Sequence, residues 1–406
     1  MISFQRYREF LDTPNMAAAL LASVPGRVPI GVAGLAILLF VQGKSGSFVQ
    51  AGASSALYVL GLAAVAPVLG RMIDHAGPRQ VLAVCSVVYP CALATLVVLV
   101  GQSAGAAWVA ACAFAAGSAL PPITICMRTL YPRLLNDASL LQTAYSIDSA
   151  LIEAIFVLGP ALVAIFVAIG SPGGAVLLAA LCGLIGATMF ARSPAVRNWT
   201  PHAVRMPVGT RNLLRHPKLL AVFAATMMYS VAFGLFEVAV TAFAAKKGVP
   251  AAAGVILALA SVGSALGALV YGSRSWSPPL PRQFLLGLVL MAVGTLLIAP
   301  ITNVYAFALF SILAGAPMAT VIAAQSMLVS RLAPREMVAE CFTWAATCLL
   351  GGISGGIAAG GMLAELGEPA LILVAAAVAT GIAGVIVWMT LSWISSAVGV
   401  QEIQRR

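Results

Sequence analysis

Long apolar runs separated by short polar segments make up nearly the whole chain. Twelve runs are each long enough for a helix to cross the hydrocarbon core of a bilayer, which takes about 20 residues. They are approximately 16–41, 48–70, 80–101, 106–131, 140–169, 174–191, 218–244, 250–272, 283–301, 304–330, 337–363 and 369–394. The runs lack the apolar–polar alternation of membrane barrel strands. The pattern therefore predicts an all-α membrane protein with twelve transmembrane helices.

The composition supports this interpretation. Of 406 residues, 61% are hydrophobic and 8% are charged, whereas a soluble domain carries about 25% charged residues. The chain therefore has too little polar surface for a soluble enzyme, a nucleic-acid-binding domain or a disordered protein. The first apolar run, about 26 residues long, is too long for the core of a signal peptide. We expect it to remain as the first span.

The positive charges lie mainly on one side of the predicted spans. Seventeen of the 22 Lys and Arg residues fall in the segments on the side of the termini. The opposite loops hold only Lys44, Lys246 and Lys247. Because cytoplasmic loops are enriched in Lys and Arg, this bias predicts a multi-pass protein of the inner cell membrane with both termini in the cytoplasm. The net charge of +10 thus reports orientation and requires no nucleic-acid partner.

One long polar segment, residues 192–217, lies at the middle of the chain. It predicts an N-terminal bundle over 1–195, a cytoplasmic linker over 196–217 and a C-terminal bundle over 218–406. A shift of 203 residues aligns Arg71, Pro78, Arg79, Gln80 and Leu82 with Arg274, Pro281, Arg282, Gln283 and Leu285. We therefore expect two pseudo-symmetric six-helix bundles, the organisation of transporters built from parallel repeats.

The loop between the second and third spans reads GRMIDHAGPR over residues 70–79. It resembles the loop 2–3 signature of the major facilitator superfamily, G-x-x-x-D-x-x-G-x-[R/K], at every specified position. Gly70 and Gly77 allow two helices to turn sharply and approach closely. Asp74 can pair with Arg71 or Arg79, or cap a neighbouring helix. The resemblance implies alternating access, with this loop as the conformational switch and a substrate site lined mainly by spans 1, 4, 7 and 10.

The twelve spans and this loop resemble the drug/proton antiporter-like branch of the family, with three departures. The second-half copy of the loop has Ser277 at the position of Asp74. Only the Gly159-Pro160 core of the branch's span-5 motif is present. Arg128 lies near the cytoplasmic end of span 4 instead of at its middle.

Ionisable residues inside the spans are candidate substrate or proton-coupling residues, because each costs at least about 2.5–3.5 kcal/mol to insert. Depth along the helices, at about 1.5 Å per residue, predicts one pair between Arg27 and Glu153 and another between Arg128 and Asp148. The prolines in residues 25–29 would open the span-1 backbone toward a cavity. The two pairs could alternatively be structural bridges between spans 1, 4 and 5.

Glu237 in span 7 has no basic residue at comparable depth in the second half of the sequence. Burial favours the neutral form of such a carboxylate. Glu237 could therefore exchange a proton during transport or hold a cationic group. The alternative is a permanently protonated glutamate bonded to a backbone carbonyl.

These observations favour a proton-coupled exporter of small hydrophobic or cationic compounds. The alternatives are a symporter or uniporter that imports a sugar, an organic acid or another metabolite and, more remotely, a polytopic membrane enzyme or a receptor. The chain has no nucleotide-binding motif, so we expect a proton gradient as the energy source, with no cofactor and no ATPase subunit. The seven cysteines lie in apolar runs without a CxxC, which favours packing over a metal site. We expect a monomer in the lipid bilayer.

Overall fold

The computed structural model describes residues 4–135, 137–199, 216–249, 252–364 and 368–405. The described part is all-helical and contains twelve segments long and apolar enough to cross a membrane, which confirms the predicted spans. In chain order the elements are α1 (Phe4–Asp12), α2 (Met16–Ser23), η1 (Pro25–Arg27), α3 (Val28–Ser45), α4 (Phe48–Ala76), α5 (Pro78–Gly101), α6 (Ala106–Ser118), α7 (Ile123–Leu134), α8 (Ala138–Ala168), α9 (Pro172–Arg192), α10 (Pro194–Arg197), α11 (Pro217–Lys246), α12 (Ala252–Gly272), α13 (Leu280–Ile298), α14 (Val304–Gly315), α15 (Pro317–Leu332), α16 (Val338–Ala364) and α17 (Pro369–Arg405).

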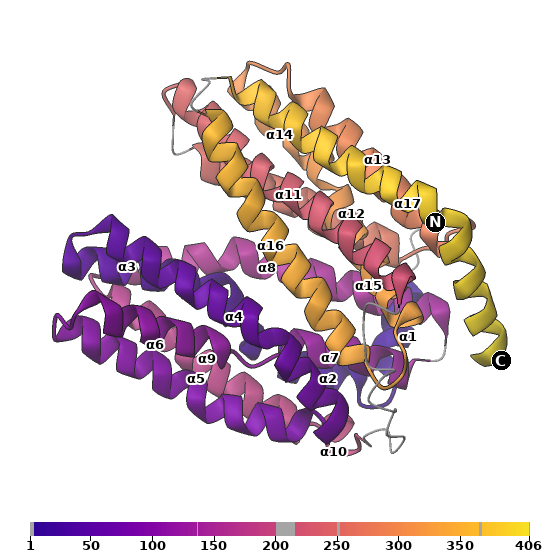
Figure 1. The fold of residues 1–406 in the computed structure, drawn as a ribbon, viewed down its shortest axis with the longest axis horizontal. Coiled ribbons are helices and arrows are strands. Elements are labelled where there is room, and N and C mark those ends of the chain that lie inside the picture. Colours follow the sequence, from indigo (N-terminus) through magenta and orange to yellow (C-terminus); the bar gives the residue numbers. More distant parts are fainter. Residues whose placement is uncertain (1–3, 136, 200–215, 250–251, 365–367, 406) are drawn as a thin grey trace.

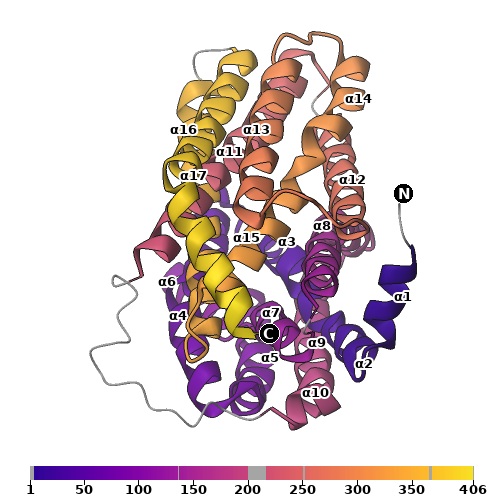
Figure 2. The same cartoon turned by 90° about the vertical axis from the view of Figure 1, so that its right-hand side faces the viewer.

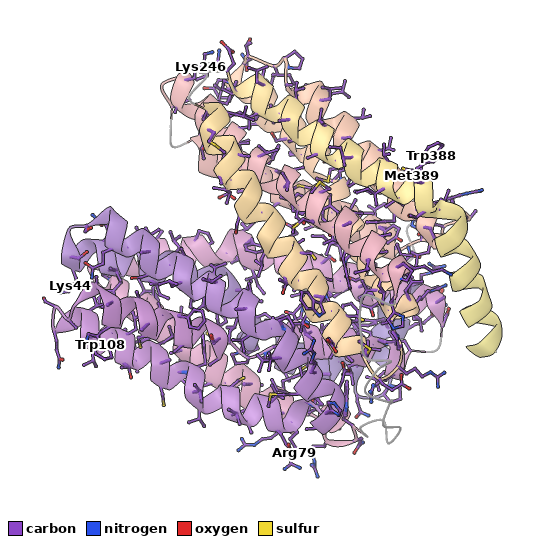
Figure 3. The ribbon with its side chains drawn as sticks, viewed as in Figure 1. Lys44, Arg79, Trp108, Lys246, Trp388 and Met389 are labelled. Carbon is purple, nitrogen blue, oxygen red and sulfur yellow. The ribbon has the colours of Figure 1, made fainter. Side chains whose placement is uncertain are left out.

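We call α1–α10 the N-terminal half and α11–α17 the C-terminal half. Figures 1 and 2 show them as two groups of helices, indigo to magenta and salmon to yellow. We call the end that holds both chain termini the terminal end, and the end that holds Lys44, Trp108 and Lys246 the far end (Figure 3). Most of the expected linker, residues 200–215, lies outside the described residues.

Three spans are interrupted, and proline marks each interruption. Span 1 changes from α2 to α3 through the single 3₁₀ turn η1, which begins at Pro25 and is followed by Pro29. Pro121 and Pro122 separate α6 from α7, and Pro317 begins α15 directly after α14. Proline cannot donate the backbone hydrogen bond that would continue a helix. Only the break around residues 25–29 was predicted from the sequence.

The buried apolar side chains form one shared core at the terminal end and two separate cores toward the far end. The shared cluster joins residues of both halves, among them Tyr131 and Tyr145 with Tyr229 and Phe342. A second cluster draws only on the N-terminal half, and a third only on the C-terminal half. The halves are therefore packed together at the terminal end, and their helices diverge toward the far end (Figures 1 and 3).

Candidate functional site

Three ionisable side chains from separate elements meet in the interior of the N-terminal half. Arg27 of η1 places its Nη1 atom 2.6 Å from Oδ1 of Asp148 on α8. Arg128 of α7 places its Nε atom 2.7 Å from Oδ2 of the same carboxylate. Arg27 and Asp148 are fully buried, whereas Arg128 keeps 16% of its side chain exposed. We call these three residues the arginine–aspartate cluster.

The local sequence explains how Arg27 reaches this position. The 3₁₀ turn at Pro25–Arg27 brings Gly26 against Gly186 of α9. A Cβ atom on Gly186 would lie 2.0 Å from the backbone nitrogen of Gly26, so a side chain there would force the two helices apart. Close packing of backbone on backbone thus holds η1 in place, and the guanidinium points into the bundle.

Tyrosines surround the cluster and extend it to the other half. The hydroxyl of Tyr131 donates to Oδ1 of Asp148 at 3.2 Å, and that of Tyr145 donates to the carbonyl of Arg128 at 3.0 Å. The rings of Tyr131 and Tyr145 meet edge-on at 5.4 Å. Tyr145 also lies 6.1 Å from Phe342 of α16, between ring centroids. The cluster therefore lies beside the contact between the halves.

The cluster carries two positive charges and one negative charge, with both carboxylate oxygens in use. Nε and Nη2 of the buried Arg27 have no hydrogen-bond partner among the described residues. Burial of a charge is costly unless it is paired and hydrogen-bonded. The cluster therefore has a net positive charge in the interior of the N-terminal half.

The predicted Arg128–Asp148 pair is confirmed, but the predicted Arg27–Glu153 pair is wrong. Helix α8 begins at Ala138, two residues before the predicted start, so Asp148 lies deeper than expected and at a depth similar to that of Arg27. Residues five apart on a helix also point about 140° away from each other. Glu153 accordingly points to a different neighbour.

Glu153, at the middle of α8, bridges the two halves. Its Oε1 accepts a hydrogen bond from the Ser264 hydroxyl of α12 at 2.9 Å. Ser264 is fully buried and accepts the backbone N–H of Ala319 on α15, also at 2.9 Å. One carboxylate thus connects α8 to two helices of the other half.

Glu237 lies apart from these groups, in the part of α11 that leads to the far end. Its residue is exposed, and among the described residues no ion pair or hydrogen bond engages its carboxylate.

The switch loop, residues 70–79, binds the first turn of α16 in the other half. Gly77 has a φ of 82°, a conformation that favours glycine, and lets α5 begin immediately after α4. The carboxylate of Asp74 accepts the backbone N–H of Ala339 at 3.0 Å and that of Glu340 at 2.9 Å. Of the predicted roles for Asp74, the structure shows capping of a neighbouring helix.

The arginines of the switch loop point to different places. Arg71 places its Nε atom 2.7 Å from Oε1 of Glu340, which adds an ion pair between the halves. Arg79 instead lines a pocket on the outside of the N-terminal half. Gly70 packs so closely on α16 that a Cβ atom would lie 2.7 Å from Oγ1 of Thr343. Glu340 was not recognised from the sequence, where only its position at the start of span 11 could have indicated a role.

A second connection, on the pseudo-symmetric side, was also missed. Gln142 and Thr143 of α8 donate side-chain hydrogen bonds to the carbonyls of Tyr271, at 2.6 Å, and Gly272, at 2.7 Å. Gly272 lies one residue from the position that the shift of 203 residues gives for Gly70. A Cβ atom on Gly272 would lie 2.6 Å from that of Ser146. Both connections therefore use a glycine at one helix end and the start of a long helix in the other half.

Helix α1 makes a further contact at the terminal end. The Tyr7 hydroxyl donates to the carbonyl of Leu269 on α12. Burial raises the pKa of Tyr7 to about 12, so the hydroxyl stays protonated and remains a donor at neutral pH. The two halves are therefore joined at this end by a neutral hydrogen bond as well as by those of the Asp74 carboxylate.

Comparisons with known proteins agree with this architecture. A family model described as Major Facilitator Superfamily matches residues 19–281. An uncharacterized MFS-type transporter, y4rN, from Sinorhizobium fredii is 27% identical over 277 residues, which cover 66% of this chain and 68% of the relative.

Solved structures show the same fold at low identity. A bacterial homologue of the iron transporter ferroportin in an outward-facing state has a TM-score of 0.75 at 14% identity, covering 93% of this chain and 99% of its own. The human organic anion transporter MFSD10 has a TM-score of 0.71 at 15% identity, covering 92% and 99%. The Escherichia coli fucose:proton symporter has a TM-score of 0.70 at 11% identity, covering 92% and 98%.

Proposed function

The chain belongs to the major facilitator superfamily, and on this premise we propose that it is a proton-coupled secondary transporter that works by alternating access. The main support is where the hydrogen bonds between the halves lie. These bonds begin at the switch loop, at the terminal end. The ones that lie furthest from that end are the bond between Glu153 and Ser264 and the bond from Thr347 Oγ1 to the carbonyl of Ala63. Among the described residues none lies closer to the far end, so this conformation is closed at the terminal end.

In this proposal the segments 1–195 and 218–406, joined by the linker 196–217, rock as two bodies. The chain acts alone in the bilayer and carries a small-molecule substrate between them. For the terminal end to open, the Asp74 cap and the bonds of Gln142 and Thr143 must break. Each is a single contact between the halves at a helix end, and such contacts can break and re-form during a cycle.

Glu153 is proposed as the coupling carboxylate. A hydrogen bond to an ionised acceptor is roughly twice as strong as a neutral one. Protonation of Glu153 would therefore weaken its bond to Ser264, at the point where the contact between the halves ends. The neutral side chain is also less costly to keep inside the membrane while the halves separate.

The arginine–aspartate cluster bears on the substrate class. A buried cluster with a net positive charge repels a cation and attracts an anionic group. Arg128, with its partly exposed side chain, is the member that a substrate can reach. We therefore favour a small, mainly apolar organic anion over the cationic compounds expected from the sequence. Export in exchange for protons is the direction implied by the resemblance to drug/proton antiporters.

Flux measurements in proteoliposomes test this function. An imposed pH gradient would drive accumulation of labelled compounds from a panel of aromatic acids, quaternary ammonium ions and sugars. We expect gradient-driven transport of an aromatic acid by the wild type. Glu153→Gln should lose this accumulation but retain exchange of labelled for unlabelled substrate. Glu368→Gln, which removes a carboxylate paired with Lys246 at the far end, is the control. Unchanged gradient-driven accumulation in Glu153→Gln would refute the coupling role.

We also propose that the terminal end faces the cytoplasm of a cell with this protein in its inner membrane. Single cysteines at Asn198 and Lys246, in a background without the native cysteines, would be treated with a membrane-impermeant reagent on intact cells. We expect labelling at Lys246 only. Labelling of the cysteine at position 198 from outside the cell would show that the orientation is the reverse of the proposed one.

A further inference from the structure

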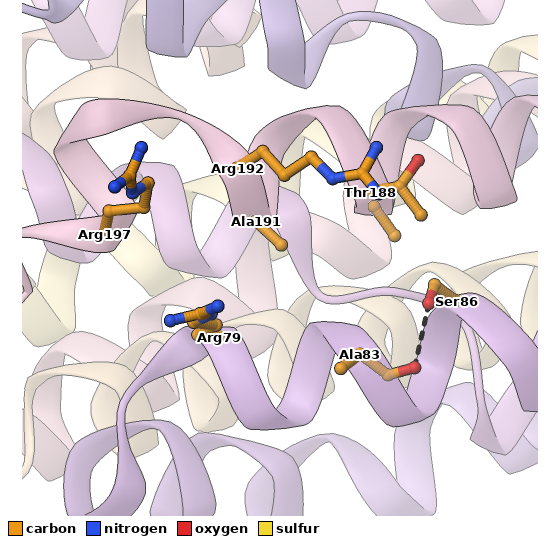
Figure 4. A pocket seen from close by; sticks show the side chains of 8 residues that line it. Arg79, Ala83, Ser86, Thr188, Ala191, Arg192 and Arg197 are labelled. Carbon is orange, nitrogen blue, oxygen red and sulfur yellow. Dashed lines mark hydrogen bonds between the residues drawn. The ribbon is translucent and has the colours of Figure 1, made fainter.

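A pocket of about 510 Å³ lies on the outside of the N-terminal half, at the terminal end, where Figure 3 labels Arg79; Figure 4 shows it from close by. Helices α5, α9 and α10 form it. Each contributes one arginine: Arg79 at the start of α5, Arg192 at the end of α9 and Arg197 at the end of α10. Figure 4 shows Arg192 and Arg197 along one wall and Arg79 on the opposite one. We call this site the arginine pocket.

The positive charges of the arginine pocket are not compensated within the described residues. No Asp or Glu lines it. No ion pair or hydrogen bond to another described side chain engages any of the three guanidinium groups. Arg71 differs, since it pairs with Glu340. Three exposed arginines around one hollow create a positive potential that favours a multivalent or strongly acidic group.

The side of the pocket away from the arginines is uncharged and mainly apolar. Its floor consists of small side chains, Ala83 and Ser86 of α5 with Ala187, Thr188 and Ala191 of α9. The Ser86 and Thr188 hydroxyls donate to the carbonyls of Ala83 and Leu184 in their own helices, so they do not add free donors to the floor. One helical turn further from the arginines, Val87 is 60% exposed on α5 and Leu184 is 37% exposed on α9. Within a transmembrane segment, such side chains face lipid tails. The pocket thus has a cationic rim at the level where the spans end and an apolar path into the membrane.

We propose that the arginine pocket binds an anionic phospholipid, with the phosphate on the arginines and an acyl chain along Val87 and Leu184. One guanidinium group can donate two parallel, charge-assisted hydrogen bonds to a phosphate. Basic pockets between transmembrane helices are suited to lipid head groups. A free phosphate would share the first contact but not the second, and the apolar path therefore favours the lipid.

The location of the pocket predicts how binding relates to transport. All three of its helices belong to the N-terminal half and pack on one another. The main contacts between the halves in the described part of the chain do not involve α9 or α10. The lipid should therefore bind equally well in both states of the proposed transport cycle. Lipid binding at this pocket does not depend on the proposed coupling role of Glu153.

Native mass spectrometry of the purified protein tests the proposal. Phosphatidylglycerol and phosphatidylcholine would be titrated separately, with soluble glycerol phosphate as competitor. The variant Arg79→Gln/Arg192→Gln/Arg197→Gln would be compared with a control of equal charge change, Arg274→Gln/Arg282→Gln/Arg335→Gln, whose arginines are also exposed at the terminal end. Thermal melting would verify that both variants are folded.

We expect phosphatidylglycerol to bind the wild type and the control more tightly than phosphatidylcholine does. Each lost arginine should weaken binding about fivefold, so the pocket variant should lose about a hundredfold. The single variant Arg192→Gln, expected to lose about fivefold, serves if the triple variant does not fold. Equal binding by the pocket variant and the control would overturn the proposal. Displacement by glycerol phosphate at concentrations similar to that of the lipid would refute the lipid as the occupant.

Discussion

At the scale of single residues, the membrane core holds charges in two different ways. Asp148 neutralises one of two arginines in a buried cluster, and Glu153 is held by a serine of the other half. Removal of the carboxylate should therefore have opposite consequences at the two sites. At the cluster it leaves buried charges without compensation, whereas at Glu153 it removes a charge.

Asp148→Asn should destabilise the protein by about 3–5 kcal/mol, because it leaves two guanidinium groups in the interior without a carboxylate. Thermal unfolding in detergent would measure this loss. Asp137→Asn is the matched control, since Asp137 only caps the first turn of the same helix and should cost about 1 kcal/mol or less. Equal melting temperatures for the two variants would show that the cluster is not a stabilising unit.

Glu237→Gln should reduce flux driven by a pH gradient and leave substrate binding in detergent unchanged. Glu237 is exposed and its carboxylate has no partner among the described residues, so it is placed to load protons in this conformation. The test is the pH profile of transport in proteoliposomes. A wild-type rate with an unchanged pH profile would leave Glu237 without a role in coupling.

The sequence predicts depth along a span to within a few residues and predicts the direction of a side chain poorly. It places Arg128 and Asp148 at similar depth, and they pair. It cannot show which face of α8 carries Glu153 toward Ser264, because that depends on how two distant helices pack. A two-residue error in the start of α8 was enough to assign Arg27 to the wrong carboxylate.

At the scale of elements, the switch loop acts on a helix more than 260 residues away. Asp74 uses both carboxylate oxygens to cap α16, and Gln142 and Thr143 hold the last carbonyls of α12. The two contacts are alike in position but not in chemistry, since Ser277 replaces the acidic residue in the second copy. Only the first should therefore depend on charge.

Asp74→Asn should impair cycling and leave substrate affinity largely intact. Asparagine supplies one acceptor oxygen instead of two and no charge for the helix dipole, a loss of about 1 kcal/mol. This corresponds to about a fivefold shift toward the state open at the terminal end. Labelling rates of a cysteine introduced in the first turn of α16 would report the shift. An affinity that falls in parallel with transport would instead place Asp74 in the substrate site.

The sequence also predicts the twelve spans and the break at residues 25–29, because apolar length and proline are local signals. The breaks in spans 4 and 10 were missed although Pro121, Pro122 and Pro317 mark them. The contacts of Gln142 and Thr143 could not be predicted from the neighbouring sequence. Polar side chains are common at the start of a helix, and the partners of these two lie in the other half.

At the scale of the whole molecule, one shared core at the terminal end and two separate cores toward the far end define a conformation in which the halves pack together at the terminal end. The internal repeat predicts two similar halves but not which end is closed. The two states share the same sequence and differ by only a few kcal/mol, so a few contacts between the halves determine which one forms.

The most direct test of the account is a pair of distance measurements by double electron–electron resonance in nanodiscs. Spin labels at Lys44 and Lys246 report on the far end, and labels at Ala76 and Arg335 report on the terminal end. At low pH the far-end distance should shorten while the terminal-end distance lengthens, and Glu153→Gln should show this shifted distribution at every pH. Two distances that stay fixed, or that change in the same direction, would contradict alternating access controlled by the protonation of Glu153.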